Sequence, residues 1–447
     1  MDYIPPGLRM ASAKLSNFNT NQFRLETVSS DTAGPNRIVT VNLPETAILD
    51  LKSFKMNLDV LTTQATVGGV TVYGRLPADA SSLISRVEVY LNGVQLMQGA
   101  SEYNTISRIL KIVRSSRDKD GSIDAALSHG RIDPQDAVED VSLVISDWKG
   151  FLGETSTRYL DTGMLGQIQV KITFAGPEVL VPKETGRSLA QNFSNVNART
   201  AASQVSYSVS NMFFTICSIQ VDPMYQDMLR QRLSTEGSID LLYKEYYSWT
   251  LDGITTNSHT TRFSLSSGSI DKLYATCRDS NHQTVGVRGQ TMAAGAFSDT
   301  LVSNALGFRS FDSEAAKEGL LRYQWSVNNV SYPQYRAGTR DALHALSYCA
   351  DKVHDSSSGN LVSSFAAYQA GMFVLPLNLS FPGEGVGVQS GYDSRGINTN
   401  MALNITGQVM PVANADAQTT AAISTFIVAE TSAKLSIGLG RSAQISF

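Results

Sequence analysis

Residues 86–97, RVEVYLNGVQLM, decide the fold class of this chain. Every second residue is apolar up to Asn92-Gly93, and the alternation resumes at Val94. Successive side chains of a strand point to opposite faces, so this alternation is typical of half-buried strands. Asn-Gly tolerates positive φ at both central positions of a type I′ turn. The stretch therefore predicts a β-hairpin.

An amphipathic helix is expected directly after this hairpin. In residues 101–113, SEYNTISRILKIV, Ser101 can serve as the N-cap. Four apolar residues then recur at helical spacing, namely Tyr103, Ile106, Leu110 and Val113. Two further short helices are expected at 222–233 and 341–353.

The rest of the chain predicts a mainly β protein. Short β-branched runs of period two are separated by clusters of Gly, Asn, Asp and Ser, as in antiparallel sandwiches. Within 48–61 the alternation changes phase, which a bulge near Ser53 would explain. Polar stretches at 279–318 and 356–364 are expected to be surface loops. Strands are expected at 23–25, 38–43, 48–61, 168–174, 205–209, 213–221, 239–250, 263–277, 323–327, 373–379, 401–405 and 423–428.

Two domains of similar design are expected. Residues 184–204 are polar and without period, so the boundary is placed there, giving domains 1–190 and 191–447. The strands at 205–221 and the helix at 222–233 suggest that a strand pair followed by a helix recurs. SGYDSRGINTN also precedes Met401 as RYLDTGMLG precedes Ile168. The halves therefore look like diverged copies of one unit.

Composition favours a protein that buries surface between subunits. Of 447 residues, 42% are hydrophobic and 17% are charged, against about 25% charged in average soluble domains. The net charge is −4 and no Lys/Arg block occurs, so direct sequence-specific binding of nucleic acid is not expected. Three cysteines without CxxC spacing favour folding in a reducing compartment. Neither a signal peptide nor a membrane span is apparent, so the chain is expected to be soluble and cytosolic when made.

We find no motif that predicts catalysis, a metal or a cofactor. The five histidines, His129, His259, His282, His344 and His354, form no HxH or HExxH pattern, and no GxSxG motif accompanies them. The glycines at 383–387 and 438–440 are expected in turns, since neither stretch follows a strand-glycine-helix pattern. The loop at 118–124 resembles part of a calcium site but lacks its terminal glutamate.

Clustered aromatic residues admit two interpretations. They could form stacking platforms for sugars or single-stranded nucleic acid, but strand aromatics more often pack in cores, which is the interpretation we favour. The clusters are Tyr243, Tyr246, Tyr247 and Trp249, then Tyr323 and Trp325, then Tyr332 and Tyr335.

Taken together, the halves resemble those of the double jelly-roll major capsid proteins. This lineage includes adenovirus hexon, tailless membrane-containing phages, virophages and algal giant viruses. The resemblance covers most of the chain in architecture. It rests on VEVYLNGVQL followed by YNTISRIL, on NNVSYPQY at 328–335, and on SGYDSRGINTN before a late strand.

The resemblance implies two tandem eight-stranded antiparallel jelly rolls with short helices and long surface loops. It implies a homotrimer of pseudo-hexagonal outline that tiles an icosahedral shell, with no cofactor and no enzymatic activity. Implied partners are further copies of the chain, neighbouring capsomers, penton and minor capsid proteins, and an internal membrane on the inner face. The chain would then reside in the virion, after synthesis in the host cytoplasm or an assembly compartment.

Two other functions remain open from sequence. A tandem β-sandwich that attaches to a host or binds carbohydrate would need three or more of the aromatic rings exposed in one cleft. A β-rich hydrolase would need a pocket with paired carboxylates.

Overall fold

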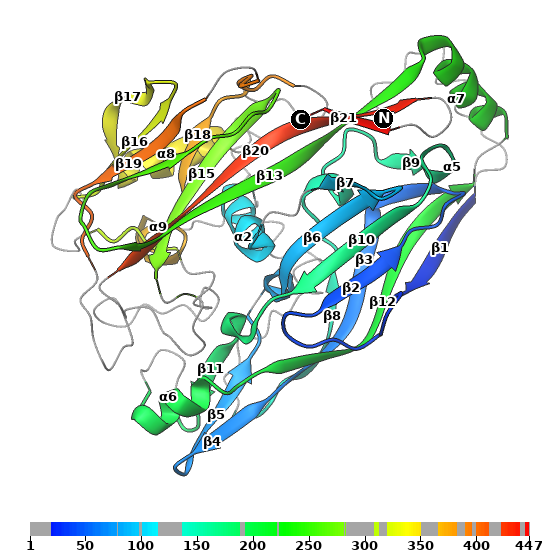
Figure 1. Ribbon diagram of the computed structural model, residues 1–447. Helices are drawn as coiled ribbons and strands as arrows, with labels where there is room; N and C mark the ends of the chain where they lie inside the picture. Colours follow the sequence, from blue (N-terminus) through cyan, green and yellow to red (C-terminus); the bar gives the residue numbers. More distant parts are fainter. Residues whose placement is uncertain are drawn as a thin grey trace.

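The chain folds into two β-sandwiches that lie side by side with helix α2 between them (Figure 1). The structure is a computed structural model. It describes residues 19–77, 79–97, 101–114, 136–187, 193–220, 223–280, 282, 308–312, 320–349, 365–381, 389–395, 399–410, 422–438 and 443–446.

The first sandwich consists of two antiparallel sheets of four main strands each. One sheet has the order β1 (Asn19–Glu26), β12 (Tyr207–Gln220), β3 (Ile48–Thr62) and β8 (Asp140–Ile145), with β9 (Tyr159–Asp161) also paired to β3. The other has the order β2 (Ile38–Asn42), β10 (Ile168–Phe174), β6 (Ile84–Leu91) and β7 (Val94–Met97). The same half of the chain also contains a small third sheet of order β11 (Val181–Glu184), β5 (Val70–Arg75) and β4 (Gln64–Val67).

The second sandwich repeats this arrangement. One sheet has the order β13 (Ser238–Ile254), β20 (Ile423–Gly438), β15 (Ile270–Asp279) and β18 (Leu375–Asn378), with β21 (Ala443–Ser446) paired to β20. The other has the order β14 (His259–Phe263), β19 (Met401–Thr406), β16 (Arg322–Val327) and β17 (Val330–Gly338).

Both sandwiches have the strand order of a jelly roll. When the eight main strands of each half are counted along the chain, both halves give sheets of order 1-8-3-6 and 2-7-4-5. This identity of topology confirms the two predicted eight-stranded jelly rolls and the predicted internal repeat. It also confirms that the segment before β19 occupies the position of the segment before β10.

Short helices connect the strands. The α-helices of the described ranges are α2 (Tyr103–Arg114), α5 (Thr162–Leu165), α6 (Val196–Ala202), α7 (Pro223–Glu236), α8 (Thr339–Cys349) and α9 (Phe365–Gly371). Within the described residues, short 3-10 helices also occur at η1 (Ala80–Leu83), η2 (Gly150–Leu152) and η3 (Pro177–Val179). The helices predicted at 101–113, 222–233 and 341–353 are therefore present as α2, α7 and α8. Because α2 begins at Tyr103, Glu102 and not Ser101 precedes its first residue.

The repeat starts later in the chain than the sequence suggested. The strands expected at 205–209 and 213–221 are one strand, β12, which pairs with β1 and β3 and completes the first jelly roll. Helix α8 follows the β16–β17 hairpin as α2 follows β6–β7, so α8 and not α7 is the counterpart of α2. We propose that the boundary between the two domains lies between β12 and α7 rather than between residues 190 and 191. A polar stretch marks a loop but does not say which sheet the next strand joins.

Matching turns close the two corresponding hairpins. Asn92 and Gly93 have φ values of 49° and 83° between the paired Leu91 and Val94, as the predicted type I′ turn requires. In the second half, Asn328 and Asn329 have φ values of 47° and 65° between β16 and β17. Asparagine adopts this left-handed region more readily than most residues.

The predicted bulge in β3 is also present. The pairing of β3 with β12 shifts between Lys55 and Asp50, where β12 advances only from Thr215 to Cys217. The Ser53 hydroxyl accepts a 2.7 Å hydrogen bond from the Cys217 amide and donates one of 2.6 Å to the Asp50 carbonyl. A side chain thus replaces the ladder bond that the bulge interrupts.

Candidate assembly interface

The two jelly rolls exchange core residues. Helix α2 belongs to the first half, yet five of its apolar side chains are buried in the core of the second: Ile106, Ile109, Leu110, Ile112 and Val113. In return, β13 and β20 of the second half supply Leu241, Tyr243, Ala433, Leu435 and Ile437 to the first core. The halves are therefore interlocked, because neither core is complete without the other half.

An ion pair joins α2 to the second jelly roll. Arg278 of β15 is 1% exposed, and its Nη2 lies 2.6 Å from Oε2 of Glu102. Its Nη1 donates to Oγ1 of Thr105 over 3.3 Å, and its guanidinium lies 5.1 Å from the ring centre of Phe426. Since a buried charge is costly without a partner, this contact holds the start of α2 against β15.

Hydrogen bonds along β13 add to the joint. The backbone of residues 154–156 in the first half pairs with β13 through Lys244 N to Glu154 O, 3.1 Å, and Ser156 N to Leu242 O, 2.8 Å. The Tyr243 hydroxyl donates to the Leu96 carbonyl over 2.8 Å. The edge of β13 at these residues is thereby covered by the other half, which removes a site for unwanted strand pairing.

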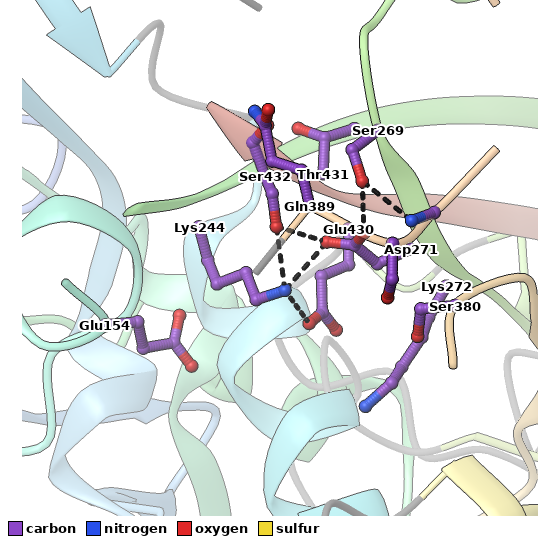
Figure 2. Close-up of polar contacts among 12 residues, drawn as sticks. Glu154, Lys244, Ser269, Asp271, Lys272, Ser380, Gln389, Glu430, Thr431 and Ser432 are labelled. Carbon is purple, nitrogen blue, oxygen red and sulfur yellow. Dashed lines mark hydrogen bonds and ion pairs between the residues drawn. The ribbon is translucent and has the colours of Figure 1, made fainter. Parts of the chain in front are cut away.

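A buried polar network lies next to this joint (Figure 2). Nζ of Lys244 on β13 lies 2.7 Å from Oδ2 of Asp271 on β15 and 3.7 Å from Oε1 of Glu430 on β20. The Asp271 and Glu430 side chains are 2% and 1% exposed, and that of Lys244 is 12% exposed. The three charges come from three adjacent strands of one sheet.

The aromatic clusters lie mainly in the cores, which confirms the interpretation that we favoured. Tyr243, Tyr246, Tyr323 and Trp325 are buried, whereas Tyr247, Trp249 and Tyr332 are half-buried and Tyr335 is exposed. Trp249 packs against Phe263 with ring centres 4.8 Å apart. These rings do not form an exposed platform for sugars or bases.

His259 and His282 are surrounded by other residues of the fold and are held by hydrogen bonds. His259 donates to or accepts from the Thr425 hydroxyl at 3.0 Å, and burial lowers its pKa. His282 is 3% exposed, and burial together with the nearby Arg278 lowers its pKa to about 4. Among the described residues no group of three or more His, Cys, Asp or Glu side chains is placed to hold a metal ion. His129, His354, the loop at 118–124 and the glycines at 383–387 lie outside the described residues.

Exposed apolar side chains lie on edge strands of both jelly rolls. Ile38 on β2 is 59% exposed, and Val330 and Tyr335 on β17 are 50% and 60% exposed. Among the described strands both lie at the ends of their sheets, so each has one edge that no further strand covers beside its apolar side chains. Such edges are candidate contacts for further copies of the chain. No helix in the described ranges has the length and apolar character to cross a membrane.

Sequence comparisons give no relative, whereas structural comparison gives several. No family model matches the chain, and no curated protein matches it. The PBCV-1 virus capsid matches with a TM-score of 0.61 at 13% identity, over 97% of each chain. The Faustovirus major capsid protein gives a TM-score of 0.55 at 10% identity, over 95% of this chain and 91% of that one.

The Sputnik virophage structure gives a TM-score of 0.54 at 12% identity, over 97% of this chain and 88% of that one. These likenesses extend over nearly the whole chain, so they involve both jelly rolls and their joint. The repeated strand order and the likenesses agree: this chain has the double jelly-roll fold of viral major capsid proteins.

Proposed function

We propose that this chain is a viral major capsid protein, a structural subunit and not an enzyme. In this proposal three copies form a trimer of pseudo-hexagonal outline, and trimers tile an icosahedral shell. The observation that carries the proposal is the interlocking of two jelly rolls of identical topology. Two similar sandwiches fixed in one rigid block give a trimer six similar units around its axis, which suits hexagonal packing.

The exposed edges support self-association. In a closed ring of three subunits, each contact joins the same two surface patches, one from each neighbouring copy. An exposed edge strand can therefore be covered by the neighbouring copy at all three contacts. The apolar side chains on β2 and β17 are uncovered in the single chain and offer such patches. The small share of charged residues, 17%, reduces the number of ions that a subunit contact would have to desolvate.

The proposed partners follow from the capsid role. They are further copies of the chain, neighbouring capsomers, penton and minor capsid proteins, and an internal membrane on the inner face. The proposed location is the virion, with synthesis in the host cytoplasm or an assembly compartment. No cofactor is needed for this role.

The carbohydrate-binding alternative receives no support from the aromatic residues that suggested it. It required at least three of their rings exposed in one cleft, and all eight lie within the described ranges. Only Tyr335 among these eight is exposed, and four are buried in the cores. We therefore propose no second function.

Light scattering on the purified chain, followed by negative-stain imaging of the same peak, tests the proposal. A particle of about three times the 48.3 kDa chain mass with a hexagonal outline is expected. A compact monomer at micromolar concentration would contradict it.

Ile38→Asp and Tyr335→Asp place a charge on β2 and β17, respectively, and form a matched pair. Loss of the trimer in one variant assigns the interface to that edge. Retention of the trimer in both places the interface on other surfaces.

A further inference from the structure

The network around Lys244 holds an amine against a carboxyl group in a fixed position. Asp271 stands at the register shift between Ile270 and Lys272 in the β15–β20 pairing, so it is the extra residue of a bulge. The bulge directs its side chain toward Lys244, two strands away, across β20 (Figure 2). The Lys244 Nζ to Asp271 Oδ2 distance is 2.7 Å.

Two serine hydroxyls bind the two oxygens of the same carboxyl group. Ser432 donates to Oδ2 over 2.6 Å, and Ser269 donates to Oδ1 over 2.7 Å. Ser269 is itself fixed, because its hydroxyl accepts a 2.9 Å hydrogen bond from the Gly391 amide. Ser432 also accepts from Lys244 Nζ over 3.0 Å, so one hydroxyl touches both reacting groups.

Besides Asp271 and Ser432, Glu430 also lies next to the Lys244 amine. Its Oε1 lies 3.7 Å from Lys244 Nζ, while its Oε2 accepts a 3.1 Å hydrogen bond from the Tyr274 hydroxyl. The side chain of Lys272, which pairs with Glu430 across the ladder, donates to the Cys349 carbonyl over 3.0 Å.

We propose that Lys244 and Asp271 condense into an intramolecular isopeptide bond, with Glu430 carrying the proton. Glu430 takes a proton from the Lys244 ammonium, and the neutral Nζ attacks Cγ of Asp271. The bond from Cγ to one Oδ breaks, and that oxygen leaves as water with the proton returned by Glu430 and a second proton from the nitrogen. An ammonium and a carboxylate thereby become one amide and one water, with no oxidant or reductant.

The site supplies the factors that such a condensation needs. The reacting groups are held in contact, which converts a bimolecular step into an effectively unimolecular one. The hydroxyls of Ser432 and Ser269 are placed to stabilise negative charge on the oxygens as Nζ attacks. Burial of Asp271 and Glu430 limits access of the water that would hydrolyse the product. The product is also a neutral amide, which removes two buried charges.

The bond would join β13 to β15 across the intervening β20. These strands lie in the sheet next to the joint between the jelly rolls, so the crosslink would lock the second jelly roll covalently. A reducing environment would not open it, unlike a disulfide.

Intact-mass spectrometry of the denatured full chain tests the proposal. The wild-type chain is expected to be lighter than its sequence mass by one water, and proteolysis should give the Lys244 and Asp271 peptides joined. Lys244→Arg and Glu430→Gln should each have their full sequence masses. Asp271→Asn should lose one ammonia instead of one water, a result that a merely structural role would not produce.

Lys434 and Asp240 provide the control. They form an ion pair of 2.6 Å between β20 and β13 of the same sheet, but their side chains are 36% and 44% exposed. Lys434→Arg should leave the loss of water unchanged. A wild-type chain with its full sequence mass would overturn the proposal and leave an ordinary ion pair, as would a loss of water that persists in Lys244→Arg.

Discussion

Truncation of Ile109 to alanine would test whether the two jelly rolls share their cores. Ile109 lies on α2 of the first half, is fully buried, and packs in the core of the second half. Removing its outer carbons leaves a cavity that the surrounding strands fill only in part. Such truncations cost about 2–5 kcal/mol, and we expect about 3 kcal/mol here because the side chain is completely enclosed.

The loss should be measured by denaturant unfolding at one fixed protein concentration, because self-association would add a concentration-dependent term. A loss of about 3 kcal/mol is a large fraction of the 5–15 kcal/mol typical of a folded domain. Hydrogen exchange then locates it. Amides of β15 and β20 in the second jelly roll should lose protection, although the substitution lies in the first half of the chain.

Ile172→Ala is the matched control, since this isoleucine is also fully buried but lies on β10 in the first core. It should lower protection in β6 and β10. If Ile109→Ala lowers protection only in those same two strands and leaves β15 and β20 unchanged, the reasoning is refuted.

Three further outcomes are expected. Gly93→Ala should lower the unfolding free energy by about 1 kcal/mol, because φ is +83° and no atom lies within 4 Å to clash, so the cost is backbone strain alone. Arg278→Met should cost about 3 kcal/mol by denaturant unfolding, since it leaves Glu102 without its ion pair, and adding Glu102→Gln should recover part of the loss. Burial would raise the pKa of Asp79, but Lys111 at 2.6 Å and the Ser81 hydrogen bonds outweigh it and lower that pKa to about 2. The ionised carboxyl therefore stabilises the fold above about pH 4, and the advantage of the native chain over Asp79→Asn should shrink by about 2 kcal/mol as the pH falls toward 2.

Local features of the fold could be predicted from the sequence because they depend on neighbouring residues. The turn at Asn92-Gly93 and the bulge at Ser53 are both present, since each follows from the residues of one short segment. The partner of β12 could not be predicted, because a strand of period two shows which faces are buried but not which strands lie beside it.

The sequence did not predict the exchange of core residues or the buried charged residues, for related reasons. The expected apolar stripe of α2 included Ile106 but not Ile109 or Ile112, although both are buried. Apolar residues on more than one face of this helix were the available signal that it is enclosed on several sides. Asp271 lies within the predicted strand at 263–277 and Glu430 just after the one at 423–428, but no motif marks them, and a charged residue is ordinarily expected at the surface.

The shared cores also limit when the chain can finish folding during synthesis. A ribosome that has released β12 has made every strand of the first jelly roll, yet the apolar residues of α2 have no core to enter until β15 and β20 follow. Because α2 ends at Arg114 and β20 begins only at Ile423, a nascent chain exposes this apolar helix while the residues between them are made. Slow release or truncation would therefore favour aggregation, and a helper protein that shields α2 would act on the nascent chain and not on the finished subunit.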